Sequence, residues 1–117
     1  MKQEQRPHWN FEEFRIYLLL YAAHADFSET EQEKEAILST CDAELYKKMH
    51  REFDEDNDYR QIEKIIVHLH EFQCTKEDIK QLLNQMKAVQ MADKAPDLLE
   101  KSMMMLLKRI FEQETSL

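Results

Sequence analysis

Carboxylate side chains recur in two similar settings along the chain. Ala25-Asp26 precedes Glu33-Lys34, and the same order returns in Ala92-Asp93 and Glu100-Lys101. In both places an apolar stretch ends in Ala-Asp, a short loop follows, and a new helix is expected to begin. Ca²⁺ and Mg²⁺ need several oxygen ligands that converge on one point. If the two halves of the chain pack about a pseudo-twofold axis, Asp26 and Asp93 approach each other and form a cation site.

Helix capping explains the same carboxylates, and this alternative stays open beside the cation site. An acidic residue in the first turn of a helix interacts favourably with the helix dipole, and aspartate is common where helices begin and end. Asp26 and Asp93 fit helix ends, while Glu33 and Glu100 fit caps and first turns. Both interpretations therefore follow from the pattern.

An acidic run from Asp54 to Asp58 resembles the start of an EF-hand loop, because carboxylates stand at alternate positions. That loop needs a glycine where this chain has Tyr59, and a bidentate glutamate where it has Ile65. We therefore interpret the run as a solvated acidic turn, which a basic partner surface could still use.

Histidines give two weaker arrangements. His70 and Cys74 lie one helical turn apart, but two ligands do not make a zinc site. His50 and Asp54 form an imidazole–carboxylate pair of the kind used in acid–base catalysis. Because no nucleophile or convergent pocket accompanies the pair, we interpret it as a helix-surface contact. The sequence thus predicts no catalytic residues and no enzyme.

Composition excludes several classes of protein. The 117 residues carry a net charge of −8, which disfavours nucleic acid, since binding needs basic groups that neutralise phosphates. The chain has no glycine, which supplies the positive-φ positions of tight hairpins and phosphate-binding loops. We therefore expect neither a β-rich fold nor a nucleotide-binding loop.

Localisation is expected to be cytoplasmic. Two cysteines are too few for a disulfide framework, so a reducing compartment fits better. The apolar run Ile16 to Ala23 is too short to span a bilayer. It also lacks the net positive segment that precedes a cleaved signal. We expect no membrane insertion.

The hydrophobic pattern predicts an all-α fold, a compact bundle of five to six helices in one domain. The expected helices cover about residues 10–25, 28–39, 42–53, 58–72, 75–89 and 96–110. Residues 1–9 are expected to be a loose leader, residues 10–113 the helical domain, and residues 114–117 a tail. The first helix is apolar nearly all round and should be central and buried.

Capping residues are expected at the start of each helix. They are Asn10, Ser28 in a capping box with Glu31, Asp42, Asp58 with Gln61, Thr75 with Asp78, and Pro96 with Asp97. Trp9 is expected to pack as a staple against the bundle.

The repeated Ala-Asp pattern resembles the TerB-like family of small helical domains, over roughly residues 11–112. The resemblance rests on Tyr21 to Asp26 with Ser28 to Glu31, and on Val89 to Asp93 with Asp97 to Glu100. It implies a bacterial stress response, including tellurite resistance, and a divalent metal bound by acidic loops. The residues implicated are Asp26, Glu33, Asp93, Asp97 and Glu100. The family has glycine after each aspartate, where this chain has Phe27 and Lys94.

Together these features predict a non-catalytic cytoplasmic binding or scaffold module that presents an acidic surface, with or without Ca²⁺ or Mg²⁺, to a protein partner. A metal-dependent hydrolase is the alternative from another class. A structural homodimer is a further alternative, because Met103 to Met105 occupy three consecutive positions and cannot all face one core stripe.

Overall fold

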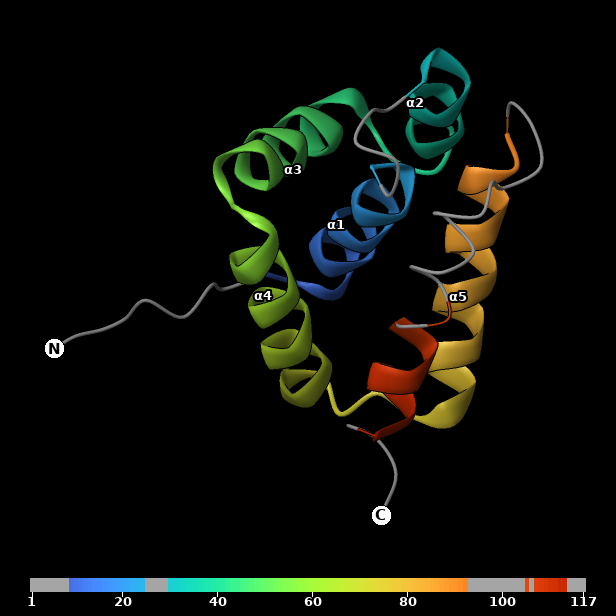
Figure 1. The fold of residues 1–117 in the computed structure, drawn as a ribbon. Helices are drawn as coiled ribbons and strands as arrows, with labels where there is room; N and C mark the ends of the chain where they lie inside the picture. The colour runs from blue at the N-terminus through green and yellow to red at the C-terminus, as the bar shows by residue number, and fades with distance from the viewer. Residues whose placement is uncertain (1–8, 25–29, 93–104, 106, 114–117) are drawn as a thin grey trace, which may run out of the picture.

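A computed structural model of the chain describes residues 9–24, 30–92, 105 and 107–113. The predicted all-α bundle is confirmed: the described elements are helices joined by short turns (Figure 1). They are α1 (Phe11–Ala23), α2 (Glu31–Leu38), α3 (Ala43–Glu55), α4 (Asp58–Glu71), α5 (Lys76–Gln90) and a final helix containing residues 107–113.

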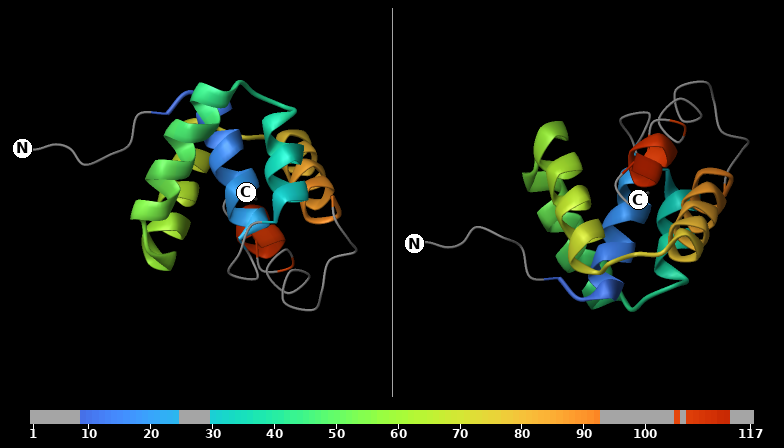
Figure 2. Two further views of the ribbon diagram at one scale, coloured as in Figure 1. Left: turned by 90° about the horizontal axis from the view of Figure 1, so that it is seen from above. Right: turned by 90° about the horizontal axis from the view of Figure 1, so that it is seen from below.

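The first helix is the centre of the bundle, as its sequence predicts. α1 contacts α2, α3, α4 and α5. α3 and α4 lie on one side of it, and α2 and α5 lie on the other (Figure 2). Every residue of α1 from Glu13 to Ala23 is buried. Because apolar side chains surround this helix, burying it from all sides removes them from water and stabilises the fold.

Several predicted caps are confirmed. The Asn10 side chain accepts the Glu13 N–H at 2.8 Å, and the Glu13 carboxylate accepts the Asn10 N–H at 2.9 Å. Thr75 and Asp78 form the same reciprocal box, and Asp42 caps α3. Trp9, the residue before the Asn10 cap, stacks on Phe14 and is buried. This contact is the predicted hydrophobic staple.

Two predicted caps are wrong in register. α2 begins after Thr30, whose hydroxyl accepts the Glu33 N–H, and not after Ser28. α4 begins after Asn57, whose side chain accepts the Arg60 N–H, and not after Asp58. In each segment two residues that can cap a helix stand one or two positions apart.

The inward face of α4 differs from the stripe that hydrophobic periodicity predicts, which consists of Ile62, Ile65, Ile66, Leu69 and Phe72. Ile65 and Leu69 are buried as predicted, but Ile62, Ile66 and Phe72 are only partly buried. Three polar residues complete the buried face, namely Gln61, Lys64 and His68. Hydrophobic periodicity places such residues outside, and it fails here because each of them has a contact within the bundle.

The turn between α4 and α5 shows a consequence of lacking glycine. Gln73 has φ of 50°, in the left-handed region that favours glycine. The Gln73 N–H donates to His70 O, and the Cys74 N–H donates to Leu69 O. These two bonds satisfy the last carbonyls of α4 in the arrangement called a Schellman motif. Glutamine there carries a steric cost of about 1 kcal/mol.

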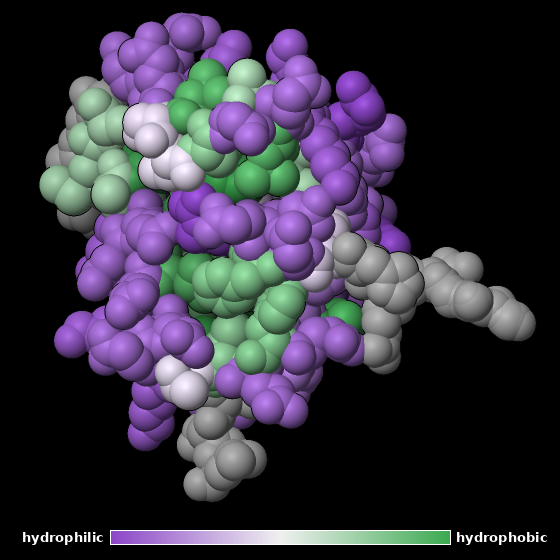
Figure 3. Space-filling model, turned by 180° about the vertical axis from the view of Figure 1, so that it is seen from behind, coloured by the Kyte–Doolittle hydropathy of each residue, from purple (hydrophilic) through white to green (hydrophobic). Residues whose placement is uncertain are grey.

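The final helix contributes Leu107 and Phe111 to the core, whereas Met105 is 66% exposed. Its predicted start at Pro96 and Asp97 lies outside the described residues, as do Met103 and Met104. Seen from behind, the surface is mostly hydrophilic, with hydrophobic side chains reaching it between the charged ones (Figure 3). In the part of the chain that the structure describes, no helix has the length and apolar character to cross a membrane.

Candidate functional site

Most of the acidic residues implied by the TerB-like resemblance lie outside the described residues. These are Asp26, Asp93, Asp97 and Glu100. The internal pseudo-repeat, which joins the same segments, is likewise a prediction that the described residues do not test. Only Glu33 can be placed among them.

Glu33 occupies a capping position. It is 2% exposed, and its carboxylate accepts the backbone N–H of Thr30 at 2.9 Å. The Thr30 hydroxyl accepts the Glu33 N–H in return, which completes a capping box at the start of α2. Capping therefore accounts for one carboxylate oxygen of Glu33.

A second group of carboxylates surrounds the buried Lys64. The ammonium lies 2.8 Å from Glu52 Oε2 and 2.7 Å from Asp56 Oδ2. Tyr17 donates its hydroxyl to Asp56 Oδ2 at 2.6 Å, and the Trp9 indole N–H donates to Glu52. Burial and the adjacent Asp56 carboxylate raise the pKa of the Tyr17 phenol. We call these five residues the Lys64 network.

A hollow of about 440 Å³ lies between α1, α2 and α5 and has Arg15 in its wall. The Arg15 guanidinium could attract an anion, but all five of its N–H groups already donate hydrogen bonds within the protein. They donate to both oxygens of Glu12, to the hydroxyl and carbonyl oxygens of Thr40, and to Gln85 Oε1. Arg15 therefore ties α1 to α5 and to the end of α2, which is a structural role.

The cysteines are poor ligands or nucleophiles in this fold. Burial, with the charge of Asp78, raises the pKa of the Cys74 thiol to about 11, and burial also raises that of Cys41. Both therefore stay protonated at neutral pH, whereas zinc and electrophiles react with the thiolate. His70 is exposed and Cys74 is buried.

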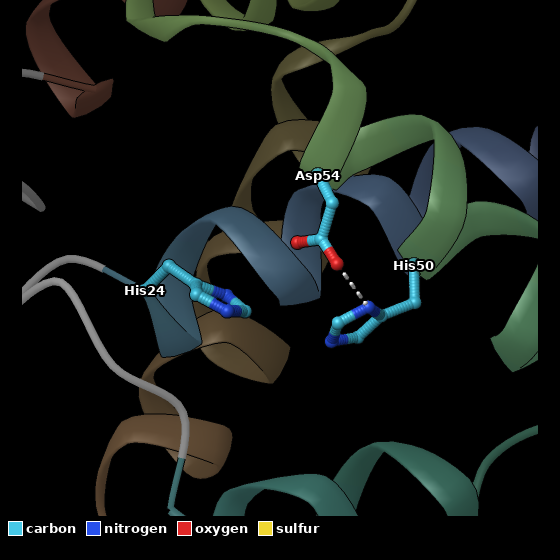
Figure 4. A group of neighbouring side chains, drawn as sticks. All are labelled: His24, His50 and Asp54. Carbon is cyan, nitrogen blue, oxygen red and sulfur yellow. Dashed lines mark ion pairs between the residues drawn. The ribbon is translucent and has the colours of Figure 1, made fainter.

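A third group of side chains meets where the end of α1 approaches α3. His24, His50 and Asp54 each offer a ligand atom, and these three atoms lie within 4.8 Å of one another (Figure 4). This is the one cluster among the described residues in which three potential metal ligands converge. We call it the α1–α3 corner.

Local structure explains why these three side chains meet. His50 and Asp54 are four residues apart on α3 and so share one face of that helix. Their contact is confirmed: His50 Nδ1 lies 3.0 Å from Asp54 Oδ2. His24 is the C-cap residue of α1, and its ring lies 5.8 Å from that of His50, centroid to centroid.

The surroundings of the corner hold the rings in place on one side and leave the other side accessible. The His24 ring packs on buried Phe53 at 4.8 Å, and the His50 ring lies 5.3 Å from that of buried Tyr46. The Asp54 side chain is 57% exposed and that of His50 is 28% exposed. A cation from solvent can therefore reach ligands whose rings are partly positioned by the core.

Sequence spacing reveals only part of this corner. The spacing of His50 and Asp54, i and i+4 on one helix, indicates their contact. His24 comes from another helix, and no spacing rule links it to the pair. In the sequence, His24 is marked only by its position near the expected end of the first helix.

Comparison of the chain with protein-family models, with curated proteins and with solved structures gives no match. The resemblance to TerB-like domains therefore stays a prediction from the residues quoted above.

Proposed function

We propose that the chain is a non-catalytic helical binding module that holds a divalent cation at the α1–α3 corner. The convergence of His24, His50 and Asp54 within 4.8 Å carries this proposal. A three-ligand cluster at an accessible surface is a common form of protein metal site. The proposal keeps the predicted divalent metal but moves its binding site from the acidic loops to the corner.

The buried charged side chains are paired with other groups of the protein, and this supports a binding role over catalysis. Arg15 is held by Glu12, Thr40 and Gln85. Lys64 is paired with Glu52 and Asp56. An acid–base catalyst needs a group that can exchange its proton with substrate, whereas these groups connect helices to one another.

The biological setting is proposed from the TerB-like resemblance. It is a cytoplasmic role in bacterial stress response, in which a protein partner binds the acidic surface. A test in a bacterial host follows directly. Expression of the chain is expected to raise tolerance to tellurite, and unchanged tolerance at equal protein level counts against this setting.

Calorimetry tests cation binding. Ca²⁺, Mg²⁺, Mn²⁺ and Zn²⁺ are titrated into the wild type, into the double variant His50→Gln with Asp54→Asn, and into the double variant Asp26→Ala with Asp93→Ala. We expect at least one cation to bind, and binding to be lost in the first variant only. Loss in the second variant alone would return the site to the acidic loops, and absence of binding in the wild type would remove the proposal.

A metal-dependent hydrolase is the second candidate, because three protein ligands leave a coordination position where water can be activated. A screen of ester, phosphate and peptide substrates with each cation distinguishes it. Turnover that disappears in the His50→Gln, Asp54→Asn variant would establish the hydrolase, and the binding module predicts none.

A homodimer is the third candidate, favoured by the 66% exposure of Met105 on the final helix. Exposed methionine is adaptable and common at partner surfaces. Light scattering at several concentrations tests it, since a dimer through this helix becomes monomeric on dilution or in Met105→Glu. A monomer at all concentrations excludes it.

A further inference from the structure

We infer that the ligand of the α1–α3 corner is a transition-metal ion of the zinc type, held by His24 Nε2, His50 Nδ1 and an Asp54 carboxylate oxygen, and that it clamps the end of α1 to α3. This inference rests on the proposed function and specifies its ligand.

Donor chemistry selects the metal class. Imidazole nitrogen suits Zn²⁺, Co²⁺, Ni²⁺ and Cu²⁺, whereas Ca²⁺ and Mg²⁺ prefer six or more oxygen ligands. The corner offers two imidazoles and one carboxylate. Two nitrogens and one oxygen match the zinc type and leave a hard cation with too few oxygens.

Hydrogen bonding fixes which nitrogen of His24 faces the metal. Its Nδ1 lies 2.9 Å from the backbone oxygen of Leu20. Since a carbonyl oxygen only accepts, Nδ1 must carry the hydrogen, and the lone pair of the neutral ring is then on Nε2. Metal-binding histidines usually donate their other N–H to a carbonyl or carboxylate in this way.

His50 and Asp54 already stand at about the separation of two metal ligands. His50 Nδ1 lies 3.0 Å from Asp54 Oδ2, and this ion pair is the dashed line in Figure 4. Two ligands of a tetrahedral zinc ion lie about 3.3 Å apart, so an ion bound by both atoms would take the place of the proton between them.

Distances require only a small closure of the cluster. Ligands at 2.0–2.1 Å from a tetrahedral zinc ion lie about 3.3 Å apart. One ligand atom of each residue lies within 4.8 Å of the other two, so the most distant pair must approach by at most about 1.5 Å. Rotation of the partly exposed side chains of His50 and Asp54 can supply this movement without displacing a helix.

The end of α1 also favours a cation. The carbonyl end of a helix carries partial negative charge, which a basic residue in the last turn often offsets. α1 has no basic residue in its last turn. A metal bound beside His24, at the C-cap position, would occupy the place where positive charge is most favourable.

Metal binding at this position couples to the stability of the whole bundle. The ligands come from two helices, so the complete site exists only in the folded chain, and any ion that binds it favours folding. α1 is the central helix that contacts α2 to α5. Three protein ligands leave one tetrahedral position, exposed beside Asp54, for water or a partner's side chain.

The test uses the full chain and three single variants: His24→Gln, His50→Gln and the matched control His70→Gln, which changes an exposed histidine of α4. Calorimetry measures affinity for Zn²⁺ and Mg²⁺, and thermal unfolding followed by far-UV circular dichroism measures stability with and without Zn²⁺. Co²⁺ substitution reports nitrogen-containing tetrahedral coordination through its visible absorption.

We expect one Zn²⁺ per chain, a 10- to 100-fold loss of affinity in His24→Gln and in His50→Gln, and no change in His70→Gln. Zn²⁺ should raise the unfolding temperature of the wild type and of the control only. Mg²⁺ should not compete.

Three results would overturn the inference. If Mg²⁺ or Ca²⁺ binds at the corner in preference to Zn²⁺, the cation-binding module stands but the metal class is wrong. If His24→Gln keeps wild-type Zn²⁺ affinity while His50→Gln loses it, the ion is bound by α3 alone and clamps nothing. Absence of binding by any cation would remove both the inference and the proposed function. Unchanged dichroism of each apo variant shows that it has folded.

Discussion

Carboxylates at the end of α3 are used in opposite ways. Glu52 and the C-cap residue Asp56 face the bundle and belong to the Lys64 network, in which they contact an ammonium, a phenol and an indole. Asp54, between them in sequence, faces the end of α1 and contacts His50. The side chain of Asp56 is 9% exposed, whereas that of Asp54 is 57% exposed.

The difference shows how burial decides the role of a carboxylate. A buried charge must be paired within the protein, because leaving it unpaired costs several kcal/mol. A half-exposed carboxylate is solvated and can exchange water for a ligand at little cost. The Lys64 network therefore serves stability, and the α1–α3 corner is the region that we propose for binding. The predictions below test this division.

The largest effect is expected from Lys64→Ala. The change leaves Glu52 and Asp56 near each other without their counter-ion, and breaking a buried pair in this way costs about 3 kcal/mol. Urea denaturation followed by far-UV circular dichroism measures the free energy of unfolding. Lys47→Ala, on the exposed face of α3, is the control and should change it little. Equal losses in the two variants would contradict the division.

Zinc is expected to stabilise the wild type by about 2.7 kcal/mol when the free ion is at 100 times its dissociation constant. Lys64→Ala should keep the same increment, because its site does not touch the corner, while His50→Gln should lose it. Denaturation curves with and without Zn²⁺ give both values. An increment that falls in Lys64→Ala would show that the two regions are coupled.

Tyr17→Phe is expected to cost about 2 kcal/mol at neutral pH, since it removes a 2.6 Å hydrogen bond to a charged acceptor, Asp56. Urea denaturation at pH 7 measures it. The control is Tyr59→Phe, which changes an exposed tyrosine. If Tyr17→Phe lowers the free energy of unfolding no more than this control does, the hydrogen bond between Tyr17 and Asp56 contributes nothing to stability.

The pH dependence of stability in alkaline solution gives a second test of the Tyr17 phenol. The pKa of Tyr17 is raised in the folded chain, and that of Tyr21 is raised to about 12 by burial, with the charge of Asp58. Above about pH 10 the unfolded chain loses these protons first, so it binds fewer protons than the folded chain and stability falls as pH rises. Tyr17→Phe should reduce the slope of this fall. An unchanged slope would contradict the assignment to Tyr17.

The smallest effect is expected from Glu33→Ala, which removes one half of the capping box at α2 and costs about 1 kcal/mol. Affinity for Zn²⁺ should not change, because Glu33 is not part of the corner. The exposed Glu35 provides the control, Glu35→Ala. A loss of metal affinity in Glu33→Ala would support the acidic-loop site instead.

Much of the fold follows from sequence because helices are local. The apolar character of the first helix around its whole circumference identifies α1 as central. Asn10, Asp42 and Thr75 cap their helices as predicted. The errors at α2 and α4 arise where two residues that can cap stand one or two positions apart, so that local chemistry gives no preference.

The sequence by itself determined an all-helical chain with a hydrophobic first helix, because each helix depends on contacts three or four residues apart. Only the tertiary structure decided that Lys64 is buried between two carboxylates, and that His24 joins His50 and Asp54. Both arrangements depend on how α1 and α4 pack against α3. A polar side chain that is buried with a partner has the same spacing in sequence as one that is solvated, so periodicity cannot distinguish them.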